Sequence, residues 1–527
     1  MSLELQKFLF ESTPSRTALL RHTARPQEAV YKIQVFRNHA FELVEHTIGA
    51  YLDYAGLSAA FSYSGYDDSF SFLELDENAD LVLVWADTGR YAPGAAAALL
   101  TDRLSQLRQR YSGPILLIPF GEDLDPRLTG VTVFPLSALE KDLGPAFTDE
   151  RAKAVTGTSL SGKAMLAISR ELGLKYLPAL LRPALKAVVV DFDNTLYRGV
   201  LGEDGPDGLT LTEGHRQLQA RLKALAEKGF FLCAATKNDE RDVEELFRLR
   251  QDFPLRREDF SILCASWDSK AQSVQKIAAF LNVHPDSMVF VDDNIGELGA
   301  MELAFPQIKL IHAHEDGAVT ARVLESFPGL FKLSATSDDA KRKGDVQANL
   351  QRQALQASMS HEDYVRSLQL RLRFSGDRPD QAVRVAELAN KTNQFIFNYR
   401  RYSLSQVEAM LTSPDWRVVT VSLADRLSDS GLVGVCVGHR QDGFVELDEC
   451  FVSCRALGRG IDPVIVLGAI GQITEYFGLS KLRVLFRSGP RNTPAERFVE
   501  EHLAPWLEHP ADFAYEIPDG LLTVAVE

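Results

Sequence analysis

Residues 188–196 read VVVDFDNTL, and this stretch indicates the fold of the middle of the chain. Three consecutive valines predict a short buried strand, because β-branched residues favour strands and a parallel strand is apolar on both faces. Asp191 and Asp193 follow at the carboxyl end of this strand, which is where ligands bind in open α/β sheets. Side chains alternate across an extended strand, so both aspartates are expected to point the same way with a metal ion between them.

The surrounding sequence, residues 151–332, alternates helical stretches with short apolar strands. This alternation predicts a doubly wound parallel sheet with helices on both faces. Polar residues stand at three further places in this segment: Thr236 follows a strand, Lys270 begins a helix, and Asp292-Asp293 follows another strand. Acidic residues that only cap helices after strands are the alternative interpretation.

Together these residues form a set suited to phosphoryl transfer. Asp191 would attack phosphorus, and Asp193 would protonate the leaving oxygen and then activate water. The hydroxyl of Thr236 would hold phosphoryl oxygens, and Lys270 would neutralise their charge. We predict a Mg²⁺ ion bound by Asp191, Asp193 and Asp292.

Residues 1–150 alternate in the same way and predict a separate small α/β domain. The turn after its first strand reads RNHA at 37–40, where a serine-hydrolase relative would have Gly and a nucleophilic Ser. No GxSxG motif occurs in this segment. The domain is therefore similar to a degenerate SGNH or flavodoxin-like domain, with a scaffold or docking role favoured over hydrolysis and a structural role for His39.

A polar helical connector is predicted at 333–367, followed by a third α/β domain at 368–527. Its segment RALGRG at 455–460 follows a predicted strand and opens a helix, so backbone N–H groups there would face a pyrophosphate. The RxxGxG pattern is similar to the acyl-CoA-binding loop of GNAT acyltransferases, and a flexible helix start is the alternative. Cys454 precedes the turn and is either a nucleophile or a small core residue. The predicted cofactor-binding residues are Arg455, Gly458, Arg459 and Gly460.

Composition excludes several classes of function. The net charge of −15 disfavours nucleic-acid binding, which depends on clustered Lys and Arg. No apolar stretch is long enough to cross a bilayer, and the N-terminus does not read as a secretory signal, so a cytoplasmic protein is expected. The five cysteines contain no CxxC pair and predict free thiols.

The ordered DxDxT, Thr, Lys and Asp-Asp series resembles the haloacid dehalogenase (HAD) superfamily, and within it the FkbH-like proteins. Family members commonly have Trp where Tyr197 stands and Ser where Thr236 stands. The segments that carry the resemblance are DFDNTLYRGVLGEDG at 191–205, ATKND at 235–239, WDSKA at 267–271, FVDDN at 290–294, NKTNQF at 390–395, GLVG at 431–434 and SCRALGR at 453–459.

This resemblance implies a linked reaction. A glyceryl unit would be taken from 1,3-bisphosphoglycerate, phosphate removed, and the glyceryl group loaded as a thioester on the phosphopantetheine of an acyl carrier protein (or on CoA) in polyketide biosynthesis. A phosphatase acting on another small phosphorylated metabolite is the first alternative. A non-catalytic module that docks carrier proteins is the second.

Overall fold

The computed structural model describes residues 3–25, 29–151, 153–333, 348, 351–352, 355, 358–453, 455–457, 459–489, 492–517 and 523–526. Cys454, Gly458 and most of the predicted connector 333–367 lie outside these described residues. The chain divides into two compact units, Met1–Ile277 with His284–Ala335, and Ala278–Val283 with Thr336–Glu527. Among the described residues, no helix has both the length and the apolarity needed to cross a membrane.

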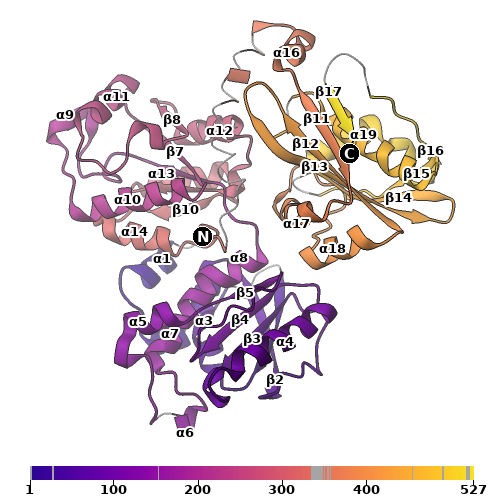
Figure 1. Ribbon diagram of the computed structural model, residues 1–527. Coiled ribbons are helices and arrows are strands. Elements are labelled where there is room, and N and C mark those ends of the chain that lie inside the picture. The colour runs from indigo at the N-terminus through magenta and orange to yellow at the C-terminus, as the bar shows by residue number, and fades with distance from the viewer. Residues whose placement is uncertain are drawn as a thin grey trace. The chain divides into compact units, whose positions relative to one another are not determined.

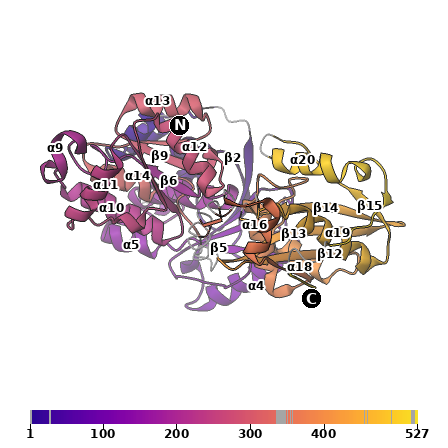
Figure 2. The same ribbon diagram turned by 90° about the horizontal axis from the view of Figure 1, so that it is seen from above.

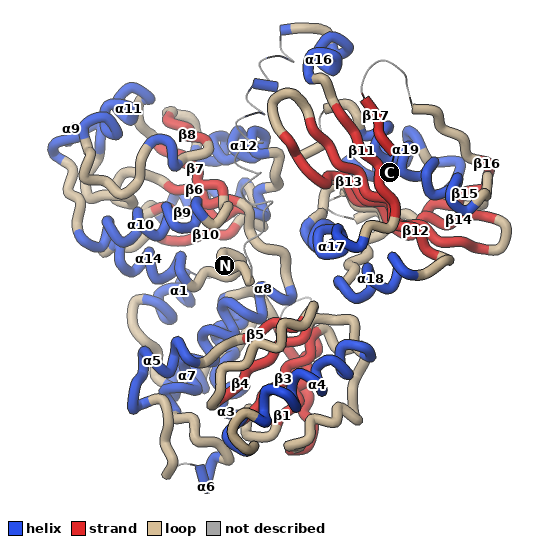
Figure 3. Tube along the Cα trace, in the orientation of Figure 1, coloured by secondary structure: helices blue, strands red, loops and turns tan. Residues whose placement is uncertain are grey.

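The first unit begins with a five-stranded sheet in the order β2-β1-β3-β4-β5, whose strand pairs are all parallel (Figures 1 and 3). This is the flavodoxin-like order, which confirms the predicted fold class. The strands are β1 (Val30–Arg37), β2 (Ser58–Tyr66), β3 (Leu81–Asp87), β4 (Ile115–Phe120) and β5 (Val131–Val133). The main helices are α3 (Glu42–Tyr54), α4 (Ala95–Arg110), α5 (Ser137–Leu143) and α7 (Gly162–Glu171). Residues of α7 belong to the same buried cluster as β1 and β3, so this core extends beyond residue 150.

A second parallel sheet in the first unit has the order β10-β9-β6-β7-β8. The earliest strand, β6, is central, which is the Rossmann-type arrangement. The strands are β6 (Ala187–Val190), β7 (Phe231–Thr236), β8 (Ile262–Ala265), β9 (Met288–Asp292) and β10 (Lys309–His312). The helices are α9 (Leu201–Gly208), α10 (Glu213–Glu227), α11 (Glu240–Leu249), α12 (Lys270–Leu281), α13 (Ile295–Ala304) and α14 (Gly317–Glu325).

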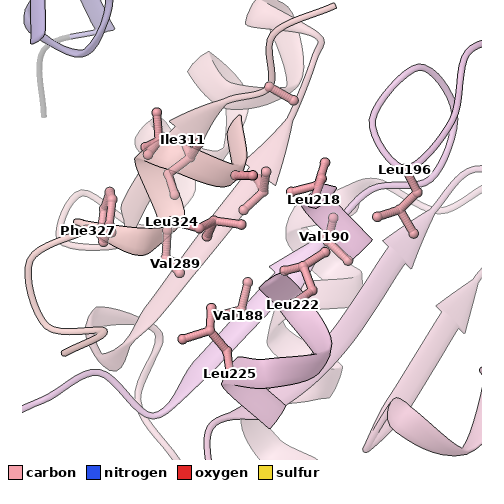
Figure 4. Close-up of a cluster of buried hydrophobic side chains, with 14 of the residues drawn as sticks. Val188, Val190, Leu196, Leu218, Leu222, Leu225, Val289, Ile311, Leu324 and Phe327 are labelled. Atoms are coloured by element: carbon pink, nitrogen blue, oxygen red, sulfur yellow. The ribbon is translucent and has the colours of Figure 1, made fainter. Parts of the chain in front are cut away.

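The core of this sheet explains why the valine run becomes its centre. Val188 and Val190 pack against Leu218 and Leu222 of α10, as Figure 4 shows. Helices α10 and α14 touch closely, because a Cβ added at Gly317 would lie 2.7 Å from the carbonyl oxygen of Gly214. Helix α1 (Leu3–Phe10) contributes to the same core, where it contacts β10 and α14 of this sheet and also α3 of the flavodoxin-like part.

The second unit contains a seven-stranded sheet in the order β16-β15-β14-β13-β12-β11-β17. Most neighbours are antiparallel, whereas β14 pairs with β15 and β11 pairs with β17 in parallel. The strands are β11 (Arg371–Gly376), β12 (Trp416–Ala424), β13 (Asp429–Gln441), β14 (Phe444–Val452), β15 (Lys481–Val484), β16 (Ala511–Asp512) and β17 (Thr523–Val526). The helices are α16 (His361–Leu368), α17 (Ala382–Lys391), α18 (Leu404–Thr412), α19 (Asp462–Phe477) and α20 (Thr493–His502).

Helix α19 packs against β12, β13 and β14, and Figure 2 gives a second view of these elements. The helix predicted after the RALGRG segment is thus observed as α19. This arrangement is consistent with the predicted GNAT-like α/β fold. The exact domain limits stay predictions.

Candidate active site

Three carboxylates meet at the carboxyl edge of the β6–β9 pair. Val190 is paired with Val291, so Asp191 and Asp292 leave neighbouring strands at the same level. The backbone N–H of Asp191 donates to the carbonyl of Val291 at 3.0 Å. One carboxylate oxygen each from Asp191, Asp292 and Asp293 lies within 4.8 Å of the other two. A cation would stabilise such a convergence of like charges, and hard oxygen ligands are those that Mg²⁺ prefers.

Lys270 supplies positive charge that partly compensates the three carboxylates. It begins α12, is buried, and its Nζ donates to Asp191 Oδ2 at 2.9 Å and to Asp292 Oδ2 at 2.6 Å. Burial alone would lower the pKa of Lys270, but the charges of Asp191 and Asp292 outweigh it and raise that pKa. One monovalent ammonium faces three carboxylates, so negative charge remains uncompensated.

The acidic triad could hold a divalent ion. Burial raises the pKa of Asp191 and of Asp292 above their usual range, although Lys270 opposes the rise. Burial also raises the pKa of Asp293. A bound Mg²⁺ would favour the ionised form of all three carboxyl groups, so the residues present fit the predicted ion. The sequence placed Asp293 beside Asp292 but assigned it no role.

Asp193 does not belong to this triad. Its Oδ1 accepts hydrogen bonds from the hydroxyl of Tyr197 at 2.8 Å and from the backbone N–H of Leu201 at 3.0 Å. Its Oδ2 accepts one from Nδ2 of Asn238 at 3.0 Å. A metal-ligand role for this carboxylate therefore stays a prediction, whereas its position beside the triad suits proton transfer.

The turn between β6 and these donors has a special backbone. Asn194 has a φ of +53°, in the left-handed region that Asn tolerates better than most residues. Its side-chain oxygen accepts the N–H of Gly199 at 3.0 Å, which closes the turn. Thr195 donates to Asp293 Oδ1 at 3.4 Å, so the same turn also contacts the triad.

Thr236, at the end of β7, is buried and linked to Asp193 by a single side chain. Asn238 Nδ2 donates to Thr236 Oγ1 at 2.9 Å as well as to Asp193. The structure thus brings Asp191, Asp193, Thr236 and Lys270 to the same edge of the sheet, as predicted. Sequence reasoning gave no role to Tyr197 or Asn238, although both lie inside the motifs that were quoted.

In the second unit, the predicted cofactor loop has other partners. Arg459 is buried and its Nη1 donates to Asp425 Oδ2 at 3.0 Å. Arg455 Nη2 donates to the carbonyl of Leu432 at 3.3 Å, and Gly460 has a φ of +70°. Cys454 and Gly458 lie outside the described residues, so the nucleophilic role of Cys454 stays a prediction.

The strand edge beside this loop is also occupied. The backbone of Phe397 donates to the carbonyl of Cys450 at 3.1 Å, and Val452 donates to the carbonyl of Phe395 at 3.0 Å. These backbone groups of β14 are therefore already paired, and the phosphopantetheine or CoA assignment stays a prediction.

His39, which follows β1 of the flavodoxin-like sheet, is buried. Its Nδ1 lies 3.0 Å from Thr158 Oγ1, and its ring stacks on Trp85 with centroids 4.7 Å apart. Burial, with a smaller contribution from the charge of Arg90, lowers the pKa of His39 to about 3. A neutral, packed imidazole fits a structural role.

Comparisons with known proteins give no family. No family model matches the chain, and no curated protein matches it. Among solved structures, it is similar to the N-terminal part of a Bacteroides fragilis protein that contains a phosphatase domain complexed with Mg, at 18% identity and a TM-score of 0.46 over 63% of this chain and 100% of that one. It is also similar to a ribosomal-protein-alanine N-acetyltransferase from Brucella melitensis, at 16% identity and a TM-score of 0.20 over 28% of this chain and 99% of that one. At these values neither likeness carries a conclusion about activity.

Proposed function

We propose that this protein is a Mg²⁺-dependent phosphatase or phosphotransferase that uses Asp191 as its nucleophile. The observation that carries the proposal is the contact of one buried lysine, Lys270, with both Asp191 and Asp292 inside a triad of carboxylates. A buried cluster of this composition is costly for folding, because each unpaired charge loses its hydration. Such clusters occur at functional sites.

The chemistry follows from the positions of the side chains. Asp191 attacks phosphorus, an aspartyl-phosphate bond forms, and the bond from phosphorus to the leaving oxygen breaks. Asp193 gives its proton to that oxygen and then takes a proton from the water that attacks the aspartyl-phosphate, which releases phosphate and restores Asp191. The Thr236 hydroxyl donates to a phosphoryl oxygen, and Lys270 balances its charge. Bound by Asp191, Asp292 and Asp293, Mg²⁺ would stabilise charge on the phosphoryl oxygens.

The finer proposal concerns the substrate. The resemblance to FkbH-like proteins supports 1,3-bisphosphoglycerate as phosphorylated substrate and an acyl carrier protein as acceptor of the glyceryl group. A second unit with a strand, the RALGRG turn and helix α19 in succession supports an acyl-transfer step. A purely non-catalytic docking module would have no need for the costly Lys270 and carboxylate cluster.

Phosphate release from a panel of small phosphates in Mg²⁺ tests the first proposal. Asp191→Asn should abolish release, whereas Asp142→Asn, at an exposed position in α5, should leave it unchanged. Wild-type rates in Asp191→Asn would contradict the mechanism. Intact mass spectrometry of a carrier protein after incubation with 1,3-bisphosphoglycerate tests the finer proposal separately: an unchanged carrier mass would refute glyceryl loading but not phosphoryl transfer.

A further inference from the structure

The carboxylate of Asp193 is surrounded by donors before any substrate arrives. Tyr197 and the backbone of Leu201 donate to one oxygen, and Asn238 donates to the other. The Tyr197 and Asn238 side chains are both buried. An aspartate with a single hydrogen bond could turn about its side-chain torsions, whereas donors on both oxygens fix the plane of the carboxylate.

Two features make these donors dependable. The Tyr197 side chain is fully buried, so its hydroxyl is enclosed beside Asp193. The ring of Tyr197 packs beside Phe253 with centroids 5.9 Å apart. Asn238 bonds Asp193 and Thr236 at once, so the group that moves the proton and the hydroxyl that binds the phosphoryl group keep a constant separation.

We infer that Tyr197 and Asn238 are positioning residues that aim the Asp193 carboxylate at the leaving oxygen. This inference rests on the proposed phosphoryl transfer. A general acid must be within hydrogen-bond reach of the oxygen it protonates, and small misplacements cost rate. Loss of a positioning donor should therefore lower kcat/KM most for substrates whose leaving group needs a proton.

Tyr197→Phe removes only the hydroxyl and provides the test. We expect kcat/KM for a primary alkyl phosphate to fall about 10-fold, out of the 10²- to 10⁴-fold that general acid catalysis supplies. For p-nitrophenyl phosphate the fall should stay under about two-fold, because a nitrophenolate leaves without a proton. The parameter kcat/KM reports formation of the aspartyl-phosphate, so later hydrolysis does not mask the difference.

Tyr111→Phe is the matched control, because it removes a hydroxyl that donates to the carbonyl of Ala79 at 2.8 Å in the other sheet of this unit. It should change neither rate. Equal losses on both substrates with Tyr197→Phe would show a general structural effect and overturn the inference, as would no loss on either. Absence of phosphate release by the wild type would instead refute the proposed function.

An independent observation concerns the second unit. Strands β14 and β15 run in parallel only as far as Leu447, whose carbonyl accepts the N–H of Leu485 at 3.1 Å. Beyond this point the segment Phe395–Phe397 lies between them. It bonds to Cys450 and Val452 of β14 on one side, and on the other the N–H of Arg487 donates to the carbonyl of Phe397 at 2.8 Å.

Two buried polar side chains hold this segment. The carboxylate of Glu449 accepts the backbone N–H groups of Phe397 at 2.8 Å and Arg400 at 2.7 Å. Asn492 Nδ2 donates to the carbonyl of Ile396 at 3.0 Å. All three residues of the segment are buried, and Ile396 forms an isolated antiparallel bridge to Phe451 of β14.

The occupied edge is close in sequence to the RALGRG segment, because Val452 is three residues before Arg455. An amide-containing arm whose phosphate sits at this turn would lie along β14 and bond to Cys450 and Val452, as an added strand does. We propose that Phe395–Phe397 is a displaceable segment that closes this edge, so that a pantetheine arm binds only after the segment has left it. This proposal rests on the acyl-transfer part of the proposed function.

A disulfide tests the proposal directly. Ile396 and Phe451 face each other across an antiparallel bridge flanked by the bonds to Cys450 and Val452, a narrow pair suited to a cross-link. In Ile396→Cys/Phe451→Cys, the oxidised protein should bind coenzyme A at least about 10-fold more weakly than the same protein under reductant. Wild type under the same oxidant and reductant is the control. It shows any change in coenzyme A affinity that comes from oxidation of the Cys436 and Cys450 thiols, whose sulfurs lie 3.2 Å apart.

Equal affinity of the oxidised and reduced forms would overturn the proposal, and so would coenzyme A binding by neither. Hydrogen exchange on the wild type gives a second measurement that needs no substitution. Coenzyme A should change the protection of the Phe397 amide, which loses its bond to Cys450, and unchanged protection on saturation would also refute displacement. The residues of the proposed phosphoryl transfer all lie in the first unit, so these results leave that proposal untouched.

Discussion

Replacement of Lys270 by Met tests how much of the local stability depends on one ammonium group. Met keeps the length and apolar stem of the side chain but removes the charge between Asp191 and Asp292. Both aspartates are buried, as is Lys270 itself. Without the lysine, three carboxylates share a buried site with no cation described among them.

The expected cost follows from this burial. Loss of one partner from a buried ion pair typically destabilises a protein by about 3–5 kcal/mol, because the remaining charge stays unpaired. For a region of this size, about 3 kcal/mol lowers the melting temperature by roughly 6–12 °C. Proton uptake by Asp191 or Asp292 would relieve part of the repulsion, so the lower figure is the better expectation.

Thermal unfolding in EDTA and in excess MgCl₂ measures the effect. The variant should melt well below wild type in EDTA, and Mg²⁺ should stabilise the variant more than wild type, because the ion replaces the missing charge. Lys276→Met is the matched control, since Lys276 is exposed and pairs with the exposed Asp268. Equal melting temperatures of Lys270→Met and wild type in EDTA would refute the electrostatic reasoning.

Three further outcomes are expected. Chelation of Mg²⁺ should stop phosphate release and readdition should restore it, whereas undiminished release in EDTA would contradict a metal-dependent site. Gly317→Ala should lower the free energy of unfolding by about 1–3 kcal/mol in urea, because its Cβ would lie 2.7 Å from the carbonyl oxygen of Gly214, whereas Gly299→Ala, with open space around its Cβ, should not. The folded-state pKa of His39 lies below its unfolded value, at about 3, so His39 contributes stability above pH 6.5 that is lost as the pH falls toward 3. His39→Phe should flatten the decline of the urea midpoint in this window, and equal slopes for variant and wild type would contradict the assignment.

The fold of the first unit was predictable because short stretches of its sequence are enough to identify its strands and helices. The valine run at 188–190 has one plausible environment, the centre of a parallel sheet, and the structure places it there. The candidate site was predictable in outline for the same reason. Parallel strands end at one edge, so Asp191, Thr236 and Asp292 meet whatever the lengths of the helices between them.

The donors to Asp193 could not be predicted in this way. Tyr197 reaches back to Asp193 only because the backbone at Asn194 turns through the left-handed region, which no pattern of hydrophobicity reveals. Asn238 comes from a different strand end, 45 residues away along the chain. Its role depends on side-chain direction at the end of β7, and sequence alone showed only a polar residue after a buried strand.

The second unit shows a similar limit. Arg459 was predicted to bind a cofactor, yet it pairs with Asp425, which stands 34 residues earlier in the chain. The segment NKTNQF at 390–395 carries part of the family resemblance, and the structure places its last residue, with Ile396 and Phe397, beside β14. The pairing of Phe395–Phe397 with β14 depends on the register between segments some 55 residues apart. The hydrophobic periodicity of the sequence does not determine this register.

The two units therefore differ in whether their proposed sites must rearrange before a reaction. Asp193 is oriented in advance, and preorganised groups need no rearrangement when the reaction begins. The edge of β14 is closed, and an arm would have to exchange existing strand bonds for its own. If both the preorganised Asp193 and the closed edge of β14 are real, phosphoryl transfer can begin before an acyl acceptor binds. The initial rate of phosphate release should then be the same with and without a carrier protein. A continuous phosphate assay measures this rate, and release that begins only on addition of carrier would contradict the order of events.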